Sequence, residues 1–141
     1  MSSNAFVGTW RLVSSDLSTT DGRILYPFGE DAVGCAIYTE HGHFSISIMK
    51  TSRPKTAYQD FGLASVEEKA ATVDGYLSYA GMYEVKQDKV LHHVGLSLYP
   101  NWVGVTQERL FCFDDDRLSL CTNPILILGV EFIGRAVWER V

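Results

Sequence analysis

Hydrophobic and polar residues alternate in short segments along most of the chain. Turn-forming residues, such as Asp21-Gly22 and Asp114-Asp115-Asp116, separate these segments. Alternation with a period of two is typical of strands that bury one face, and frequent turns favour an all-β sandwich or barrel. The pattern predicts eight strands: Thr9–Leu17, Gly34–Thr39, Phe44–Lys50, Met82–Lys86, Lys89–Leu98, Val105–Phe113, Arg117–Thr122 and Val130–Glu139.

Short links join most of these strands, which favours antiparallel neighbours. The link Glu40-His41-Gly42-His43 is typical of a tight hairpin in which Gly42 adopts a positive φ. Eight antiparallel strands in up-and-down order can close into a barrel without exposed edges, wide enough for one small ligand. We therefore expect a single all-β domain over residues 1–141, an eight-stranded antiparallel up-and-down barrel.

One segment, between the third and fourth predicted strands, departs from this pattern. Ser65-Val66-Glu67-Glu68 has the form of a capping box at a helix start. The apolar residues that follow the capping box at helical spacing are Ala70, Val73, Leu77 and Ala80. Gly81 then predicts the end of this helix. Two placements are open for the segment 51–81: a lid over one barrel mouth, or a helix packed on the outer wall.

Alternate side chains of a barrel strand point into the lumen, so each strand can be sorted by its more apolar set. Within residues 89–98 that set is His92, Val94, Leu96 and Leu98. His93 is then expected on the outer face. In the last strand the set is Phe132, Gly134, Ala136 and Trp138. The two small residues of this set are expected to leave room beside the two aromatic rings.

Polar groups enter the predicted lumen together with this apolar lining. Within residues 105–113, the set with the larger apolar side chains includes Phe111 and also contains Gln107 and Arg109. An apolar cavity with a few polar groups is typical of a small-molecule site, and a buried Arg needs a partner. Alternatively, these groups bond to one another and tie the core together. The candidate ligand-binding residues are Tyr38, Tyr79, Tyr83, His92, Leu96, Gln107, Arg109, Phe111 and Trp138.

Charge and composition restrict the partners. The 141 residues include 12 Lys and Arg against 17 Asp and Glu, a net charge of −5. This balance argues against nucleic-acid binding or an anionic membrane surface, and no apolar run approaches the roughly 20 residues of a membrane span. Residues 1–5 lack the features of a secretion signal, and the cysteine count of three is odd. We therefore expect a cytoplasmic protein with reduced thiols.

The chain shows none of the motifs that hold a metal or a nucleotide cofactor. The adjacent His92 and His93 point to opposite faces of a strand and do not ligate one ion together. There is no Cys-x-x-Cys, no glycine-rich phosphate loop and no dinucleotide fingerprint. We therefore expect no cofactor and no metal, and the oligomeric state is left open, a homodimer included.

Several short motifs together resemble the lipocalin-like domain family over nearly the whole chain. The first is Gly8-Thr9-Trp10, a Gly-x-Trp of the kind that lipocalins have. The most specific is the block Pro100-Asn101-Trp102-Val103-Gly104, followed by Gln107 and Arg109. Further matching positions are Asp21-Gly22, Pro27-Phe28-Gly29, Gly34, Tyr38, Gly42-His43, Tyr79-Ala80-Gly81-Met82-Tyr83-Glu84, His92-His93-Val94, Ser97 and Val137-Trp138-Glu139-Arg140.

The resemblance implies a calycin-type barrel in which Trp10 plugs the closed end. It also implies that Arg140 packs over this Trp, a cation–π contact that contributes about 0.5–2 kcal/mol. The sequence departs from the family at Gly95, where an acid is frequent, and at Val105, where Thr is usual. For function, the resemblance implies ligand binding and permits catalysis.

Two functions from different classes follow from these residues. The first is binding of a small, mostly apolar organic molecule, with Arg109 and Gln107 anchoring a carbonyl or anionic group. The second is a cofactor-free isomerase or cyclase of natural-product biosynthesis acting on such a molecule. In that enzyme, His92 is the general acid/base, and Arg109 or a Tyr hydroxyl stabilises an enolate-like oxygen.

Overall fold

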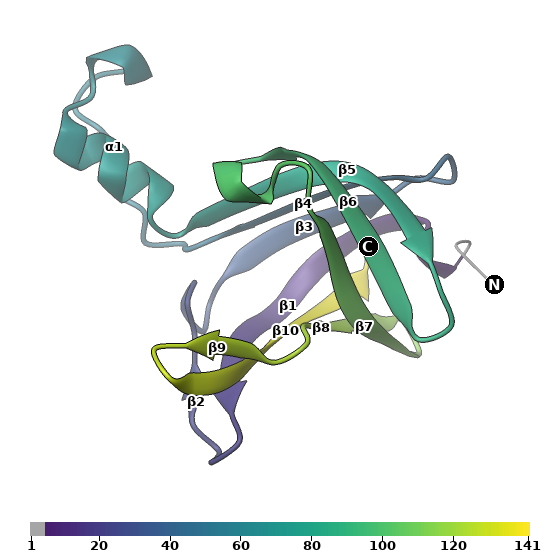
Figure 1. The fold of residues 1–141 in the computed structure, drawn as a ribbon. Coiled ribbons are helices and arrows are strands. Elements are labelled where there is room, and N and C mark those ends of the chain that lie inside the picture. The colour runs from purple at the N-terminus through teal and green to yellow at the C-terminus, as the bar shows by residue number, and fades with distance from the viewer. Residues whose placement is uncertain (1–4) are drawn as a thin grey trace.

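The computed structural model describes residues 5–141 (Figure 1). The prediction that the chain has no secretion signal concerns residues 1–5, and residues 1–4 lie outside the described residues. The first five strands are β1 (Gly8–Thr19), β2 (Ile24–Leu25), β3 (Val33–Tyr38), β4 (His43–Met49) and β5 (Tyr76–Val85). The others are β6 (Lys89–Ser97), β7 (Thr106–Asp114), β8 (Arg117–Cys121), β9 (Ile125–Ile127) and β10 (Val130–Arg140). Helix α1 spans Val66–Val73, and short 3₁₀ helices span Phe61–Leu63 and Pro100–Trp102.

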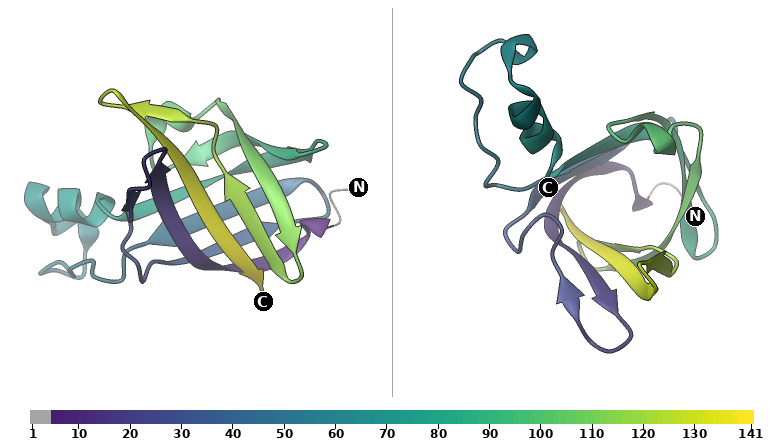
Figure 2. Two further views of the ribbon diagram at one scale, coloured as in Figure 1. Left: turned by 90° about the horizontal axis from the view of Figure 1, so that it is seen from below. Right: turned by 60° about the vertical axis from the view of Figure 1, so that its left-hand side comes forward.

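Eight strands close into an antiparallel barrel, as predicted. Their order is β1-β3-β4-β5-β6-β7-β8-β10, and β10 pairs back with β1 from Trp10↔Arg140 to Thr19↔Phe132 (Figure 2). The hairpin between β3 and β4 turns at Gly42 with φ +90°, also as predicted. The short strands β2 and β9 were missed, because two or three residues are too few for an alternation pattern to be read.

The helix is shorter than predicted and lies later in the strand order. It follows β4 rather than the third strand, because β2 adds one strand before it. It ends at Val73, and Gly75 reverses the chain with φ +86°. Leu77 and Ala80, which were assigned to the helix, belong to β5, where they pair with both β4 and β6. Hydrogen bonds to two neighbouring strands outweigh a helical spacing that four residues happen to show.

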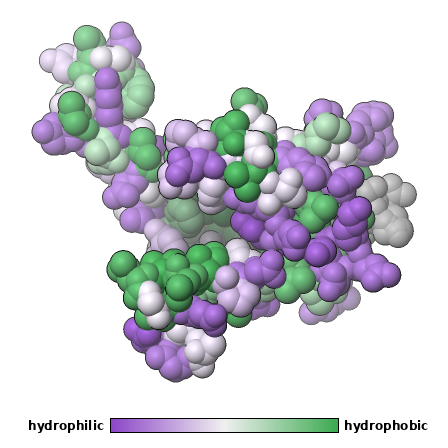
Figure 3. Space-filling model, in the orientation of Figure 1, coloured by the Kyte–Doolittle hydropathy of each residue, from purple (hydrophilic) through white to green (hydrophobic). Residues whose placement is uncertain are grey.

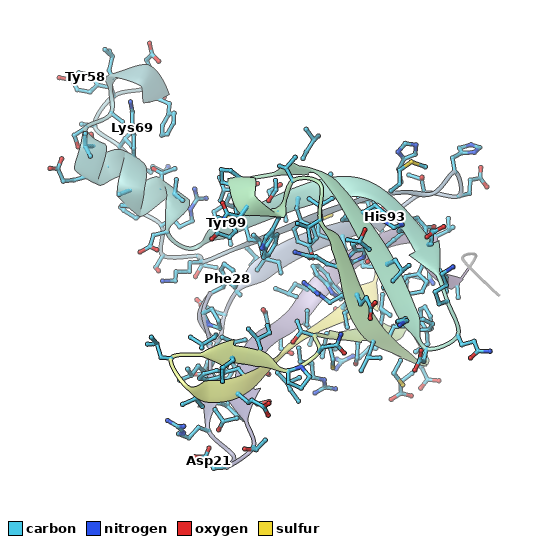
Figure 4. The ribbon with its side chains drawn as sticks, in the orientation of Figure 1. Asp21, Phe28, Tyr58, Lys69, His93 and Tyr99 are labelled. Carbon is cyan, nitrogen blue, oxygen red and sulfur yellow. The ribbon has the colours of Figure 1, made fainter. Side chains whose placement is uncertain are left out.

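Residues 51–75, called the arm below, are neither a lid over the mouth nor a helix packed on the wall. The arm extends away from the barrel, and Figure 4 labels Tyr58 and Lys69 on it. Helix α1 has the predicted capping box but contains no buried residue, and Val66 is 79% exposed. None of the helices described in residues 5–141 combines the length and apolar character needed to cross a bilayer.

The predicted inward faces are mostly correct, but two residues after a β-bulge are exceptions. His92, Val94 and Gln107 are buried, and His93 lies on the outer face of β6 (Figure 4). Leu96 and Leu98, however, are exposed, by 73% and 37%. The pairing of β5 with β6 shifts between Ala80 and Gly81, so that Gly95 is left without a counterpart. One extra residue reverses the alternation beyond it, which is why the prediction that Leu96 lines the lumen is wrong.

Aromatic side chains fill the end of the barrel near the amino terminus. Trp10 is buried, and its Nε1–H donates to the Phe6 carbonyl at 2.9 Å. The Arg140 guanidinium lies 4.2 Å from the Trp10 ring centre, as the resemblance implied, and donates to the carbonyls of Ala5 and Val7. The ring of Phe6 contacts further rings with centroids 5.0–5.1 Å away, those of Tyr38, Phe111 and Phe113. This half of the barrel is therefore solid.

Candidate functional site

The other half of the barrel contains a cavity of about 180 Å³, at the end where β1 finishes and β10 begins. The surface is hollowed there, and apolar residues gather beside the hollow (Figure 3). Phe28, from the loop after β2, lies at this open end (Figure 4). The other lining residues are Ser15, Leu17, Ile46, Ile48, Leu77, Tyr79, Trp102, Arg109, Leu120, Thr122, Gly134, Arg135, Ala136 and Trp138.

The cavity exists because small residues of β10 face large rings of other elements. Trp138 is buried at its inner side, and Gly134 and Ala136 precede it on the same face of β10. Trp102 stands in the 3₁₀ helix that begins with Pro100, and its ring meets Tyr79 edge-on at 5.2 Å. A lumen with aromatic walls and two small residues opposite them suits a flat apolar ligand.

Arg109 is a charged residue among those that line this cavity. It is half-buried, and its guanidinium donates to Gln107 Oε1 at 2.8 Å and to the Glu108 carbonyl at 2.9 Å. Within residues 5–141 it forms no ion pair. The residues that line the cavity include no carboxylate, and the side chain of Arg135 is exposed on the outer face of β10, where it donates to Ser119 Oγ. The site therefore presents hydrogen-bond donors and positive charge to a ligand.

His92 and Tyr38 form a neutral pair behind the cavity. The Tyr38 hydroxyl and His92 Nε2 share a hydrogen bond of 2.8 Å, and the Phe44 ring stacks on the imidazole at 4.3 Å. Burial, with smaller effects of the Arg109 and His93 charges, lowers the pKa of His92 to about 3. Burial likewise raises the pKa of Tyr38 well above its usual value. Both side chains are therefore uncharged near pH 7, and neither lines the cavity.

The nine predicted ligand-binding residues separate into three groups. Tyr79, Arg109 and Trp138 line the cavity. Leu96 lies on the outer wall. The remaining five, Tyr38, Tyr83, His92, Gln107 and Phe111, do not line it and pack in the interior. Rings in contact lead from Phe6 through Tyr38 and His92 to Tyr79, so these groups tie the solid half of the barrel to the cavity wall.

Sequence reasoning missed several residues that line the cavity. Leu77 was assigned to the helix, and Phe28 stands in a loop without periodicity. Trp102 belongs to the Pro-Asn-Trp-Val-Gly block, so a signal was present, but a loop residue cannot be assigned a face from alternation. Leu120 and Thr122 alternate on and just beyond β8, and sorting that strand by its apolar set would have found them.

Comparisons with known proteins agree with this architecture. A family model described as a lipocalin-like domain matches residues 7–141. The chain is 33% identical over 106 residues to the 4'-hydroxy-3'-methoxypropiophenone carrier protein ppsC of Aspergillus oryzae. That alignment covers 69% of this chain and 96% of the relative. No solved structure matches the chain.

Proposed function

This chain belongs to the lipocalin-like domain family, and we propose that it is a carrier that binds a small, mostly apolar organic molecule inside its barrel. The observation that supports this most directly is the cavity of about 180 Å³ in the open half of the barrel. The name of the relative, a carrier of an aromatic ketone, supports the same class of function.

The size of the cavity limits the ligand to about one aromatic ring. A closed apolar cavity of roughly 150 Å³ accommodates benzene, and this cavity of about 180 Å³ is open at one end. The ring of the ligand packs against Tyr79, Trp102 and Trp138. A carbonyl or anionic oxygen accepts hydrogen bonds from Arg109. The molecule named for the relative, a single ring with hydroxyl, methoxy and short acyl groups, has this size and this chemistry.

The position and the pKa of His92 favour a carrier over the isomerase or cyclase. A general acid/base must reach the reacting atoms and works best with a pKa near the working pH. His92 does not line the cavity, and its pKa of about 3 keeps it neutral.

Titration calorimetry with 4'-hydroxy-3'-methoxypropiophenone as the ligand tests the proposal. Wild-type protein is expected to bind it at a ratio of one to one and to release it chemically unchanged. Ala136→Phe fills the cavity and is expected to weaken binding at least tenfold. Ile37→Phe introduces the same ring on the exposed face of β3, outside the cavity, and is expected to leave binding intact. Equal affinity of the two variants, or no binding by the wild type, contradicts a ligand site in the lumen.

Other expectations from the sequence stay predictions for this carrier. These are a single domain over residues 1–141, a cytoplasmic location, the absence of a cofactor, and a partner list without nucleic acid or membrane. A homodimer also remains open.

A further inference from the structure

The charges around the cavity differ in sign from those of the chain as a whole. The protein has a net charge of −5, with 17 Asp and Glu residues. None of these acidic residues lines the cavity, and its charged side chain is Arg109, because Arg135 alternates with the inward-facing Gly134 and Ala136 and is exposed on the outer face of β10. A cavity lined by one sign of charge raises the local concentration of ligands of the other sign.

Arg109 has hydrogen-bonding capacity left for a ligand. A guanidinium has five N–H donors, and two of its nitrogens donate to neutral acceptors, Gln107 Oε1 and the Glu108 carbonyl. These contacts hold the group in place but leave its charge uncompensated. Arg109 is half-buried, and a ligand in the cavity covers it further, so that a neutral ligand leaves the cation without a counter-charge whereas an anion supplies one.

The positive charge of Arg109 also acts on the other polar groups of the lumen. It is among the causes that lower the pKa of His92, and it opposes the rise in the pKa of both Tyr38 and Tyr79. The charge of Arg109 thus favours the neutral form of the histidine over its cation, and the anionic form of each tyrosine over its neutral form. Three side chains from different strands thus experience the same positive field.

Resting on the carrier function proposed above, we infer that the preferred ligand is an anion, a single-ring aromatic carboxylate whose carboxylate pairs with the Arg109 guanidinium. A carboxylate matches the planar fork of a guanidinium with two parallel hydrogen bonds and neutralises its charge. A ketone oxygen accepts hydrogen bonds from the same group but leaves the charge in place. The carboxylate is therefore expected to bind about tenfold more tightly than a ketone of the same shape.

Two probes of nearly equal shape separate charge from fit. 3,4-Dimethoxybenzoate and 3,4-dimethoxyacetophenone differ in one group, a carboxylate against an acetyl, and neither has an ionisable phenol. Calorimetry at pH 7 and low salt is expected to give about tenfold tighter binding of the benzoate to the wild type. Arg109→Gln is expected to abolish this preference, because it weakens binding of the benzoate more than binding of the acetophenone. Arg117→Gln, in an exposed ion pair with Glu139 outside the cavity, is the matched control and is expected to retain the preference.

Each outcome decides one of the two proposals. If the acetophenone binds as tightly as the benzoate or more tightly, the anion inference is overturned and the carrier function stands. If Arg135→Gln removes the preference while Arg109→Gln keeps it, the assignment to Arg109 is overturned. If neither probe nor 4'-hydroxy-3'-methoxypropiophenone binds, the carrier function itself fails. The wild-type comparison needs no variant, so misfolding of Arg109→Gln would not leave the inference untested.

Discussion

The Tyr38 hydroxyl and the Nε2 atom of His92 lie 2.8 Å apart in the packed interior of the barrel. The pair connects β3 with β6, two strands that do not neighbour each other in the sheet. His92 Nδ1 has no hydrogen-bond partner in residues 5–141, and an unpaired buried group of this kind costs about 1–3 kcal/mol. Burial of the imidazole favours its neutral form and gives the barrel a pH-dependent stability.

His92 is expected to make the folded state sensitive to acid. Its pKa is about 3 in the folded protein and about 6.5 when unfolded, so between these values the unfolded chain binds more protons. The stability is fully present above pH 6.5 and is lost as the pH falls towards 3, by about 2–3 kcal/mol at pH 4.5. Urea unfolding at pH 7 and pH 4.5 measures this loss.

A variant without the imidazole isolates this contribution from other titrating groups. At pH 7 the wild type is expected to have a larger free energy of unfolding than His92→Gln. This difference is expected to shrink at pH 4.5. An unchanged difference between the two proteins at both pH values would show that His92 is not held neutral by burial.

Arg140 is expected to stabilise the barrel through Trp10 without affecting the ligand. Its guanidinium lies over the Trp10 ring and donates to two carbonyls of the segment before β1. Arg140→Gln should lower the free energy of unfolding by about 1–2 kcal/mol. The affinity for the ligand should stay within about twofold, since this end of the barrel lies away from the cavity. A large loss of affinity without a loss of stability would contradict this separation.

Gly81 is expected to tolerate no side chain, whereas Gly95 should tolerate one. A Cβ at Gly81 would overlap the His93 carbonyl oxygen, while a Cβ at Gly95 has the Ala80 carbonyl as its nearest neighbour at 3.9 Å. Gly81→Ala should therefore cost about 2 kcal/mol or more, and Gly95→Ala less than about 1 kcal/mol. Thermal unfolding of the two variants compares them directly, and similar costs would contradict the bulge as described.

The arm is expected to add little to the stability of the barrel. Val66 of α1 is 79% exposed and Val90 of β6 is fully buried, so the same substitution at both positions forms a matched pair. Val66→Ala should change the free energy of unfolding by less than about 0.5 kcal/mol, and Val90→Ala should cost about 2 kcal/mol. A comparable cost at Val66 would show that the arm packs against the barrel or another molecule in solution.

Alternation along the chain predicted the barrel because each strand buries one face. Hydrophobic residues therefore recur at every second position of a strand. The same reasoning failed at Leu96, where one extra residue in the bulge at Gly81 and Gly95 reverses the faces. It failed in residues 76–81 because local helical spacing does not reveal pairing with two distant strands.

Alternation also predicted one part of the candidate site, the inward faces, but not which inward residues line the cavity. The inward faces of His92, Gln107 and Arg109 are local properties of two strands. Which of them reaches the cavity depends on Phe6 and the rings around it, which fill one half of the lumen. Phe6 lies before the first strand, and no pattern in the sequence assigns it to the interior.

The three tryptophans offer the most direct test of a ligand site in the open half of the barrel. Trp102 and Trp138 line the cavity, whereas Trp10 is buried at the closed end. Titration of ¹⁵N-labelled protein with 4'-hydroxy-3'-methoxypropiophenone is expected to shift the indole N–H signals of Trp102 and Trp138 and to leave that of Trp10 in place. A shift of the Trp10 signal alone, or unchanged signals at saturating ligand, would contradict the proposed site.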